Sequence, residues 1–198
     1  NIDSTTFSLD GSVGNGAYTG GGGFWSSFVG VNPRYKPEAG EPGGQGHIHF
    51  SIVADPNDPY TVYVGGDRQD LPFPNHIGAV NYSGNLRRGD ASIARGTGSA
   101  STQWEHLTHS NAISTIPGGG TANFSSPHAD SRELTFDANG EIIETDDGGV
   151  YRRTSPTDNT GDWYSICGNL QVTEQHDVAY CATSGVILSG NQDTGTTQ

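Results

Sequence analysis

The stretch of residues 128–163 restricts the fold of this chain more than any other, because it has the pattern of short strands joined by tight turns. An alternating apolar run covers residues 133–136, a turn follows at residues 137–140, and a second run returns through residues 142–145. Two such runs around a turn rich in Asp, Asn and Gly predict a β-hairpin. An acidic, Gly-rich corner at residues 146–149, a third run and Trp163 complete the module.

The same pattern occurs three times along the chain. The copies are residues 49–67, 131–149 and 176–195, and each has an apolar strand, a polar turn, a second apolar strand and a terminal Gly/Asp corner. The corners at Asp67, Asp147 and Asp193 are separated by 80 and 46 residues, so one long insertion interrupts the repeat. Irregular repeats of about 40–50 residues built from antiparallel strands favour propeller blades over a helical solenoid.

Composition supports strands over helices. Only 31% of the residues are hydrophobic and 30 are glycine, and no window shows the apolar spacing of an amphipathic helix. We therefore expect an all-β fold of β-propeller blades. Each blade would be a four-stranded antiparallel sheet, and the chain would form an incomplete ring or a fragment of a larger propeller.

The repeats divide the chain into parts of a single propeller segment. Residues 1–46 are a Gly-rich leading segment or a worn blade, residues 47–120 a blade with the long insertion, residues 121–175 a blade, and residues 176–198 the start of the next blade. Within the insertion, residues 77–82 are predicted to form a strand and residues 86–90 a polar loop, followed by Trp104. The same order precedes Trp163, so both tryptophans are predicted to be equivalent buried anchors between blades.

The charge of the chain limits its partners. A net charge of −13 with nine basic residues disfavours nucleic acid, because phosphate binding needs clustered Lys and Arg. The sequence contains no run of eighteen apolar residues, so we expect no insertion into a membrane. The acidity fits a secreted or cell-surface protein, or carboxylates directed toward sugars or cations. Since the sequence contains no methionine, we expect a processed, excised or truncated polypeptide.

Cys167 and Cys181 are the two cysteines. A disulfide between them in an oxidising compartment and two separate buried thiols are both compatible with their spacing.

The run TDDGGVYRRT at residues 145–154, with GDW at 161–163 and GNQDTGT at 190–196, resembles the Asp-box (BNR) β-propellers of the sortilin, glycoside hydrolase family 74 and sialidase-like kinds. The intact S-x-D-x-G-x-x-W motif is not found in the chain. The resemblance implies a propeller fold. It also implies that the first Asp of D-x-G-G-x-Y, which is Asp146 here, would act as general base in a glycosidase.

Two carboxylates are the catalytic candidates. Asp146 and Asp130 could flank a scissile bond, since glycosidases use paired carboxyl groups. Asp147 would then hold the turn at Gly148 and Gly149, because neighbouring residues near a strand end point to opposite sides. In the alternative interpretation all of these aspartates cap turns and accept backbone N–H bonds.

A second group of candidates could bind a ligand. His47 and His49 are predicted to share one face of a strand, and His128 with Asp130 repeats that spacing. Imidazoles converging with carboxylates could hold a transition metal, although satisfied polar side chains explain the pattern equally. The candidate ligand-binding residues are His47, His49, His128, Asp147 and Asp193. No cofactor is expected, while Ca²⁺ could bind the oxygen-rich turns.

Three functions are compatible with these residues. The leading hypothesis is an extracellular recognition or scaffold module that binds a glycan or protein ligand. The alternatives are a glycoside hydrolase with paired carboxylates and a structural repeat of a large secreted surface or filament protein. In each case other copies, or the remainder of a parent chain, could close the propeller.

Overall fold

A computed structural model describes residues 49–69, 73–75, 77–94, 103–109, 119–170, 175–192 and 195–197, the last three as backbone. The predictions for residues 1–46, for His47 and for Asp193 lie outside these residues. The described residues form strands, turns and loops, which confirms the all-β class. No helix in this part of the chain is long and apolar enough to cross a bilayer.

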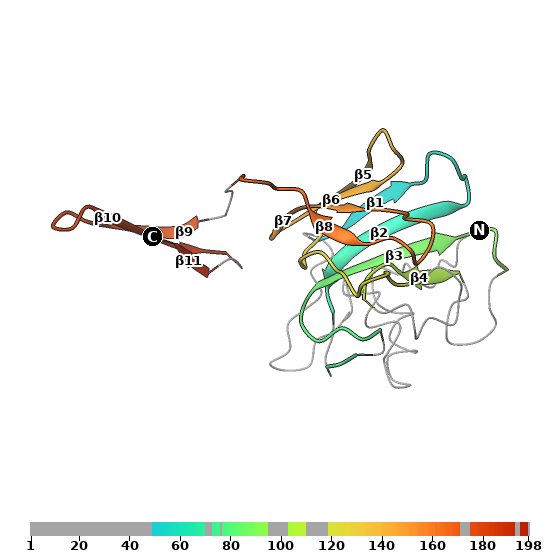
Figure 1. Ribbon diagram of the computed structural model, residues 1–198, viewed down its shortest axis with the longest axis horizontal. Helices are drawn as coiled ribbons and strands as arrows, with labels where there is room; N and C mark the ends of the chain where they lie inside the picture. The colour runs from blue at the N-terminus through green and yellow to red at the C-terminus, as the bar shows by residue number, and fades with distance from the viewer. Residues whose placement is uncertain are drawn as a thin grey trace.

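Three antiparallel sheets contain the eleven strands of the described residues (Figure 1). The first sheet is ordered β1 (Ser51–Ala54), β2 (Thr61–Arg68), β3 (Gly84–Asp90) and β4 (Trp104–His106). The second sheet is ordered β5 (Glu133–Phe136), β6 (Ile142–Asp146), β7 (Gly149–Arg153) and β8 (Trp163–Ser165). The third sheet is ordered β11 (Gly195–Thr197), β10 (Val186–Asn191) and β9 (Gln175–Cys181). Among the described strands no sheet closes into a ring, so the propeller remains a prediction.

The first hairpin of the first sheet and the first hairpin of the second sheet have similar turns, each held by an Asp side chain. The Asp137 carboxylate accepts hydrogen bonds from the backbone N–H groups of Asn139 and Glu141, and Gly140 adopts a φ of 79°, which glycine reaches without steric cost. In the first hairpin the Asp55 carboxylate accepts the N–H of Asn57 in the same way. The Asp-rich turns predicted from the sequence are therefore local side-chain caps.

The two tryptophans occupy equivalent positions. Trp104 opens β4 opposite Gly89, and Trp163 opens β8 opposite Arg153. Both are buried, with 1% and 5% of their surface exposed. This confirms the predicted burial and the matching positions of the two tryptophans in their sheets, while their packing between blades stays a prediction. The predicted strand at residues 77–82 is wrong, because the strand lies at Gly84–Asp90, where a polar loop was expected.

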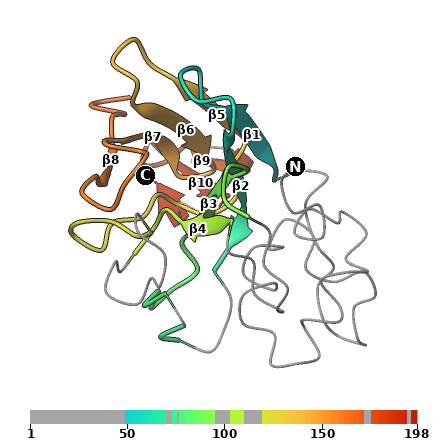
Figure 2. The same cartoon turned by 90° about the vertical axis from the view of Figure 1, so that its right-hand side faces the viewer.

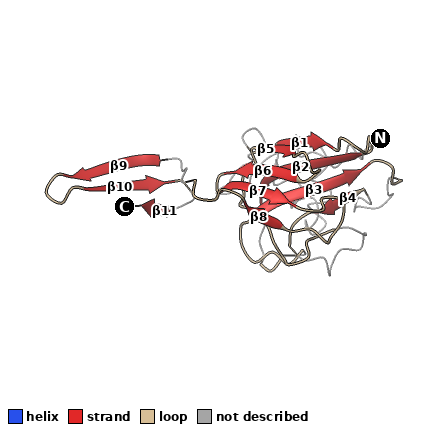
Figure 3. Ribbon diagram, turned by 45° about the horizontal axis from the view of Figure 1, so that its top comes forward, coloured by secondary structure: helices blue, strands red, loops and turns tan. Residues whose placement is uncertain are grey.

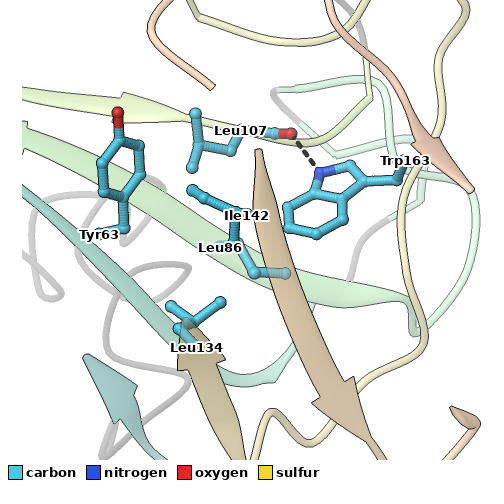
Figure 4. Packing of buried hydrophobic residues seen from close by; sticks show 6 residues of the cluster. All are labelled: Tyr63, Leu86, Leu107, Leu134, Ile142 and Trp163. Carbon is cyan, nitrogen blue, oxygen red and sulfur yellow. Dashed lines mark hydrogen bonds between the residues drawn. The ribbon is translucent and has the colours of Figure 1, made fainter. Parts of the chain in front are cut away.

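The hydrophobic core lies between the first and second sheets (Figure 4). The first sheet and the segment after it contribute three residues, and the second sheet contributes three more: Tyr63, Leu86, Leu107, Leu134, Ile142 and Trp163. The Trp163 indole N–H donates to the Leu107 carbonyl at 2.7 Å (Figure 4). The core thus joins one face of each sheet, with the second sheet packing through its tryptophan-bearing face.

Arg153 connects the loop that follows β4 with the loop between β7 and β8, beside this core. Its side chain is fully buried, and its guanidinium donates to four backbone carbonyl groups, those of Leu107, Gly120, Asp158 and Gly161. Two of these carbonyls follow β4 and two lie between β7 and β8. Because a buried charge needs hydrogen-bond partners, this arrangement fixes the connections of both sheets to one side chain.

The third sheet stands apart from the other two (Figures 1 and 3). Its strand β9 is exposed along its whole length. Cys181 at the end of β9 is exposed and Cys167 is partly buried, and the two thiols are not bonded to each other.

Candidate functional site

The polar candidates gather at one end of the first and second sheets. The strands are antiparallel, so the starts of β1 and β5 and the ends of β2 and β6 meet at the same edge. Strands β1 and β5 also lie side by side (Figure 2). The residues at this edge are His49, Asp67, His128, Asp130, Glu144, Asp146 and Asp147.

A serine pair joins the two sheets just inside this edge. The hydroxyl oxygens of Ser51 and Ser131 lie 2.6 Å apart in a buried hydrogen bond. Gly65 faces the pair so closely that an added Cβ would sit 2.3 Å from the Ser131 oxygen. The close approach of the three backbones therefore depends on small residues.

The centre of the site consists of His49, Asp130 and Asp147. We call these three residues and Asp67 the His–Asp cluster. One potential ligand atom from each of the first three lies within 4.8 Å of the others. His49 Nδ1 is 3.9 Å from Asp130 Oδ1. The Asp130 backbone has a φ of 71°, a left-handed conformation that Asp tolerates better than most residues.

Burial distinguishes this cluster from an ordinary acidic surface. The His49 side chain is almost completely buried, and those of Asp130 and Asp147 are 18% and 13% exposed. Arg132 donates to Asp147 Oδ1 through Nε at 2.8 Å and lies 2.7 Å away through Nη2. This ion pair neutralises one carboxylate and leaves the cluster acidic.

Asp67 belongs to the cluster although sequence reasoning did not nominate it. Burial, a hydrogen bond with Asp130 and the negative charge of Asp130 raise the pKa of Asp67 to about 7. The Asp67 carboxyl group therefore keeps its proton to higher pH than an exposed aspartate does. The repeat could have identified Asp67, because Asp67 lies in the terminal Gly/Asp corner of the first copy as Asp147 does in the second.

Asp146 has the turn role that was assigned to Asp147. Asp146 Oδ1 accepts the N–H groups of Gly148 and Gly149 at 2.8 and 2.9 Å, whereas Asp147 pairs with Arg132 and joins the His–Asp cluster. The predicted division of structural roles between the two aspartates is wrong. The reason is that the β6–β7 hairpin pairs Asp146 with Gly149, so Asp146 is the residue that closes the turn.

Glu144 and Asp146 form a second carboxyl pair beside the cluster. Glu144 is fully buried, and burial together with the negative charge of Asp146 raises its pKa well above the ordinary value. Burial also raises the pKa of Asp146 to about 6, while the Glu144 side chain and the two glycine N–H groups act in the opposite direction. Burial therefore disfavours the charged form of both carboxyl groups.

His128 lies over the turn that Asp146 closes. A Cβ added at Gly148 would sit 2.5 Å from the His128 Cβ, and His128 Nδ1 is 3.1 Å from the Ala129 carbonyl oxygen. The structure thus brings His49, Asp130 and Asp147 together, and places His128 beside Asp146. Asp146, the predicted partner of Asp130, binds the β6–β7 turn and is not among the residues that meet in the His–Asp cluster.

The donor atoms define what this edge can bind. An imidazole nitrogen with carboxylate oxygens can coordinate a divalent cation, and the same acceptors can receive hydrogen bonds from hydroxyl groups. His49, Asp67, Asp130 and Asp147 are the residues that could take part.

Comparison with protein-family models, curated proteins and solved structures found no match to this chain.

Proposed function

We propose that the chain is an extracellular recognition module of the β-propeller kind, and that its His–Asp cluster binds a carbohydrate. The observation that carries the proposal is the convergence of His49, Asp130 and Asp147, from three separate segments of two sheets, on one point at a shared edge. In this proposal the first and second sheets are consecutive blades, which is supported by the matching positions of Trp104 and Trp163.

The chemistry of the cluster favours a ligand rich in hydroxyl groups. Carboxylates accept hydrogen bonds and cannot donate them when ionised, so the ligand must supply donors or positive charge. A sugar presents adjacent hydroxyls that can each donate to a different carboxylate oxygen. A divalent cation such as Ca²⁺ could also take part, because it is bound by carboxylate oxygens.

Glycoside hydrolysis is the second candidate, and one observation favours it. Asp67, with its pKa raised to about 7, has the protonation behaviour of a general acid. Its hydrogen bond to Asp130 weighs against this role, because the two carboxyl groups of a glycosidase stand about 5–9.5 Å apart around the scissile bond. Binding is therefore the better supported function.

The test is a glycan-array screen followed by titration calorimetry on the best ligand, with Ca²⁺ present and with a chelator. Asp130→Asn and Asp147→Asn should each weaken binding at least about tenfold, the loss of one charged hydrogen bond of about 1.5 kcal/mol. Glu133→Gln, an exposed carboxylate on β5, is the matched control and should bind normally. Equal binding by all variants would refute the site, and release of reducing sugar would favour the hydrolase.

A further inference from the structure

The donor atoms of the His–Asp cluster surround a common point. One potential ligand atom from each of His49, Asp130 and Asp147 lies within 4.8 Å of the others, and His49 Nδ1 is 3.9 Å from Asp130 Oδ1. The ligand atoms of a four-coordinate Zn²⁺ lie about 3.3 Å apart when each bond is about 2.0–2.1 Å long. The cluster is therefore somewhat wider than an occupied site, and an ion would draw the side chains together.

Asp130 carries a buried oxygen atom that lacks a hydrogen-bond donor. Asp67 shares a hydrogen bond with Asp130, yet none of the described residues donates to Asp130 Oδ1. A buried carboxylate oxygen without a donor is costly, and a bound ion is one of the ordinary explanations for such a group in a native protein. The oxygen that lies nearest to His49 Nδ1 is thus suited to a metal ligand.

Two further carboxylates complete the donor set. Both contacts of Arg132 with Asp147 are made to Oδ1, so Oδ2 is the oxygen that remains for an ion. Asp67 adds another carboxylate through its closeness to Asp130. The set then contains one imidazole nitrogen and three carboxylates, from a residue before β1, a residue of β2, a residue before β5 and a residue between β6 and β7.

The kinds of donor atom select the ion. Ca²⁺ prefers a shell of oxygen atoms, to which the nitrogen of His49 does not contribute. Imidazole is a preferred ligand of Zn²⁺ and related transition metals, and Zn²⁺ also accepts carboxylate oxygens in four-coordinate sites. One histidine with three aspartates therefore favours a transition metal over Ca²⁺.

We infer that the His–Asp cluster binds a divalent transition metal ion, with Zn²⁺ as the reference ion, through His49, Asp67, Asp130 and Asp147. Two of these ligands belong to the first sheet and two to the second, so the ion joins the two sheets at their shared edge. The inference concerns the residues of the proposed carbohydrate site and goes beyond that function, because the ion binds when no carbohydrate is present.

The experiment is titration calorimetry of the whole chain with ZnCl₂ alone, after a chelator has removed other metals. One tightly bound ion per chain is expected, and the thermal unfolding midpoint should rise with free Zn²⁺, because the ion binds the folded chain. His49→Gln and Asp130→Asn should each weaken binding at least about 100-fold, since losing a residue that only supports a metal ligand already costs about 10–100-fold. Ca²⁺ at equal concentration should not displace Zn²⁺.

Two controls separate loss of the site from other effects. His176→Gln removes a histidine of β9 that lies beside Gln192, and this variant should bind Zn²⁺ as the parent chain does. In the presence of a chelator, Asp130→Asn should unfold at or above the midpoint of the parent chain, because it removes a buried carboxylate oxygen and Asn also tolerates the left-handed backbone.

The outcomes for the metal and for the carbohydrate are distinct. Equal Zn²⁺ binding by the parent chain, His49→Gln and Asp130→Asn would identify ions held elsewhere on the surface and overturn the inference, as would tighter binding of Ca²⁺ than of Zn²⁺. Zn²⁺ binding without glycan binding supports the metal site and removes the proposed recognition function. Glycan binding in a chelator, with no Zn²⁺ binding, does the reverse.

Discussion

The side-chain oxygens of Ser51 and Ser131 lie 2.6 Å apart, although 80 residues separate the two serines in the sequence. Each serine stands at the beginning of the first strand of its sheet or just before it. The bond therefore fixes the edge at which the His–Asp cluster assembles, and several of its consequences can be measured.

Gly65→Ala should destabilise the protein by about 1–3 kcal/mol, the range for overpacking a filled core. The new methyl group would sit 2.3 Å from the Ser131 oxygen and 2.5 Å from the Ser51 oxygen, so the serine pair must separate. Urea unfolding measures the loss. Gly190→Ala on β10, where a Cβ meets nothing within 4 Å, should cost much less. Equal losses at both positions would show that the serine pair is not tightly held.

Trp163→Ala should lower the free energy of unfolding by about 3–5 kcal/mol, because it empties a large volume in the core. Trp163→Phe keeps most of that volume and loses the N–H donor. Its cost should be smaller, since the Leu107 carbonyl retains a hydrogen bond from Arg153 at 3.1 Å. Thermal and urea unfolding give both values. Wild-type stability of Trp163→Ala, combined with lost glycan binding, would instead identify an exposed stacking platform.

Asp146→Ala should destabilise the protein by about 1–3 kcal/mol, because two turn N–H groups lose their acceptor. Asp147→Ala breaks a partly exposed ion pair with Arg132, which typically contributes about 0–1 kcal/mol. Unfolding curves of the two variants give the order directly. A larger loss for Asp147→Ala would restore the division of roles expected from the sequence.

The buried carboxyl groups should make stability fall as pH rises from about 4 to 7. Asp67 and Asp146 have folded-state pKa values raised to about 7 and about 6, and the unfolded chain titrates near 4. Below the unfolded values both states are protonated and the stabilisation is complete. As pH increases, the unfolded chain releases its protons first, and the stabilisation is lost as pH passes through the folded values.

Asp67→Asn and Glu144→Gln should remove part of this dependence, so each variant should gain stability relative to the parent chain between pH 4 and 7. The Asp137→Asn control should behave in the opposite sense. The backbone N–H of Glu141 lowers the pKa of Asp137, so its contribution is present above the unfolded pKa and is lost toward acid. Urea midpoints at several pH values measure these trends, and parallel curves for all variants would contradict them.

The strands of the hairpins could be predicted from alternation, and the tryptophan positions from their repeated spacing. Residues 77–82 and 84–90 could not be separated, because Arg87 and Arg88 suggest a polar loop while the fold buries both side chains. The site was only partly predictable for a similar reason. The hairpin register decides whether Asp146 or Asp147 accepts the N–H groups of the turn. The closeness of Asp67 to Asp130 depends on how the two sheets pack.

The four carbonyl groups held by Arg153 have a consequence for how the molecule opens. Pulling the second sheet from the first would take the buried Arg153 guanidinium away from the Leu107 and Gly120 carbonyls, two of its four partners, and the loss of partners by a buried charge is costly. The first and second sheets should therefore exchange their slowest amide protons at a single common rate, as one cooperative unit. The third sheet shares neither Arg153 nor the core, so its amides should exchange far sooner, through an opening that leaves the other two sheets intact.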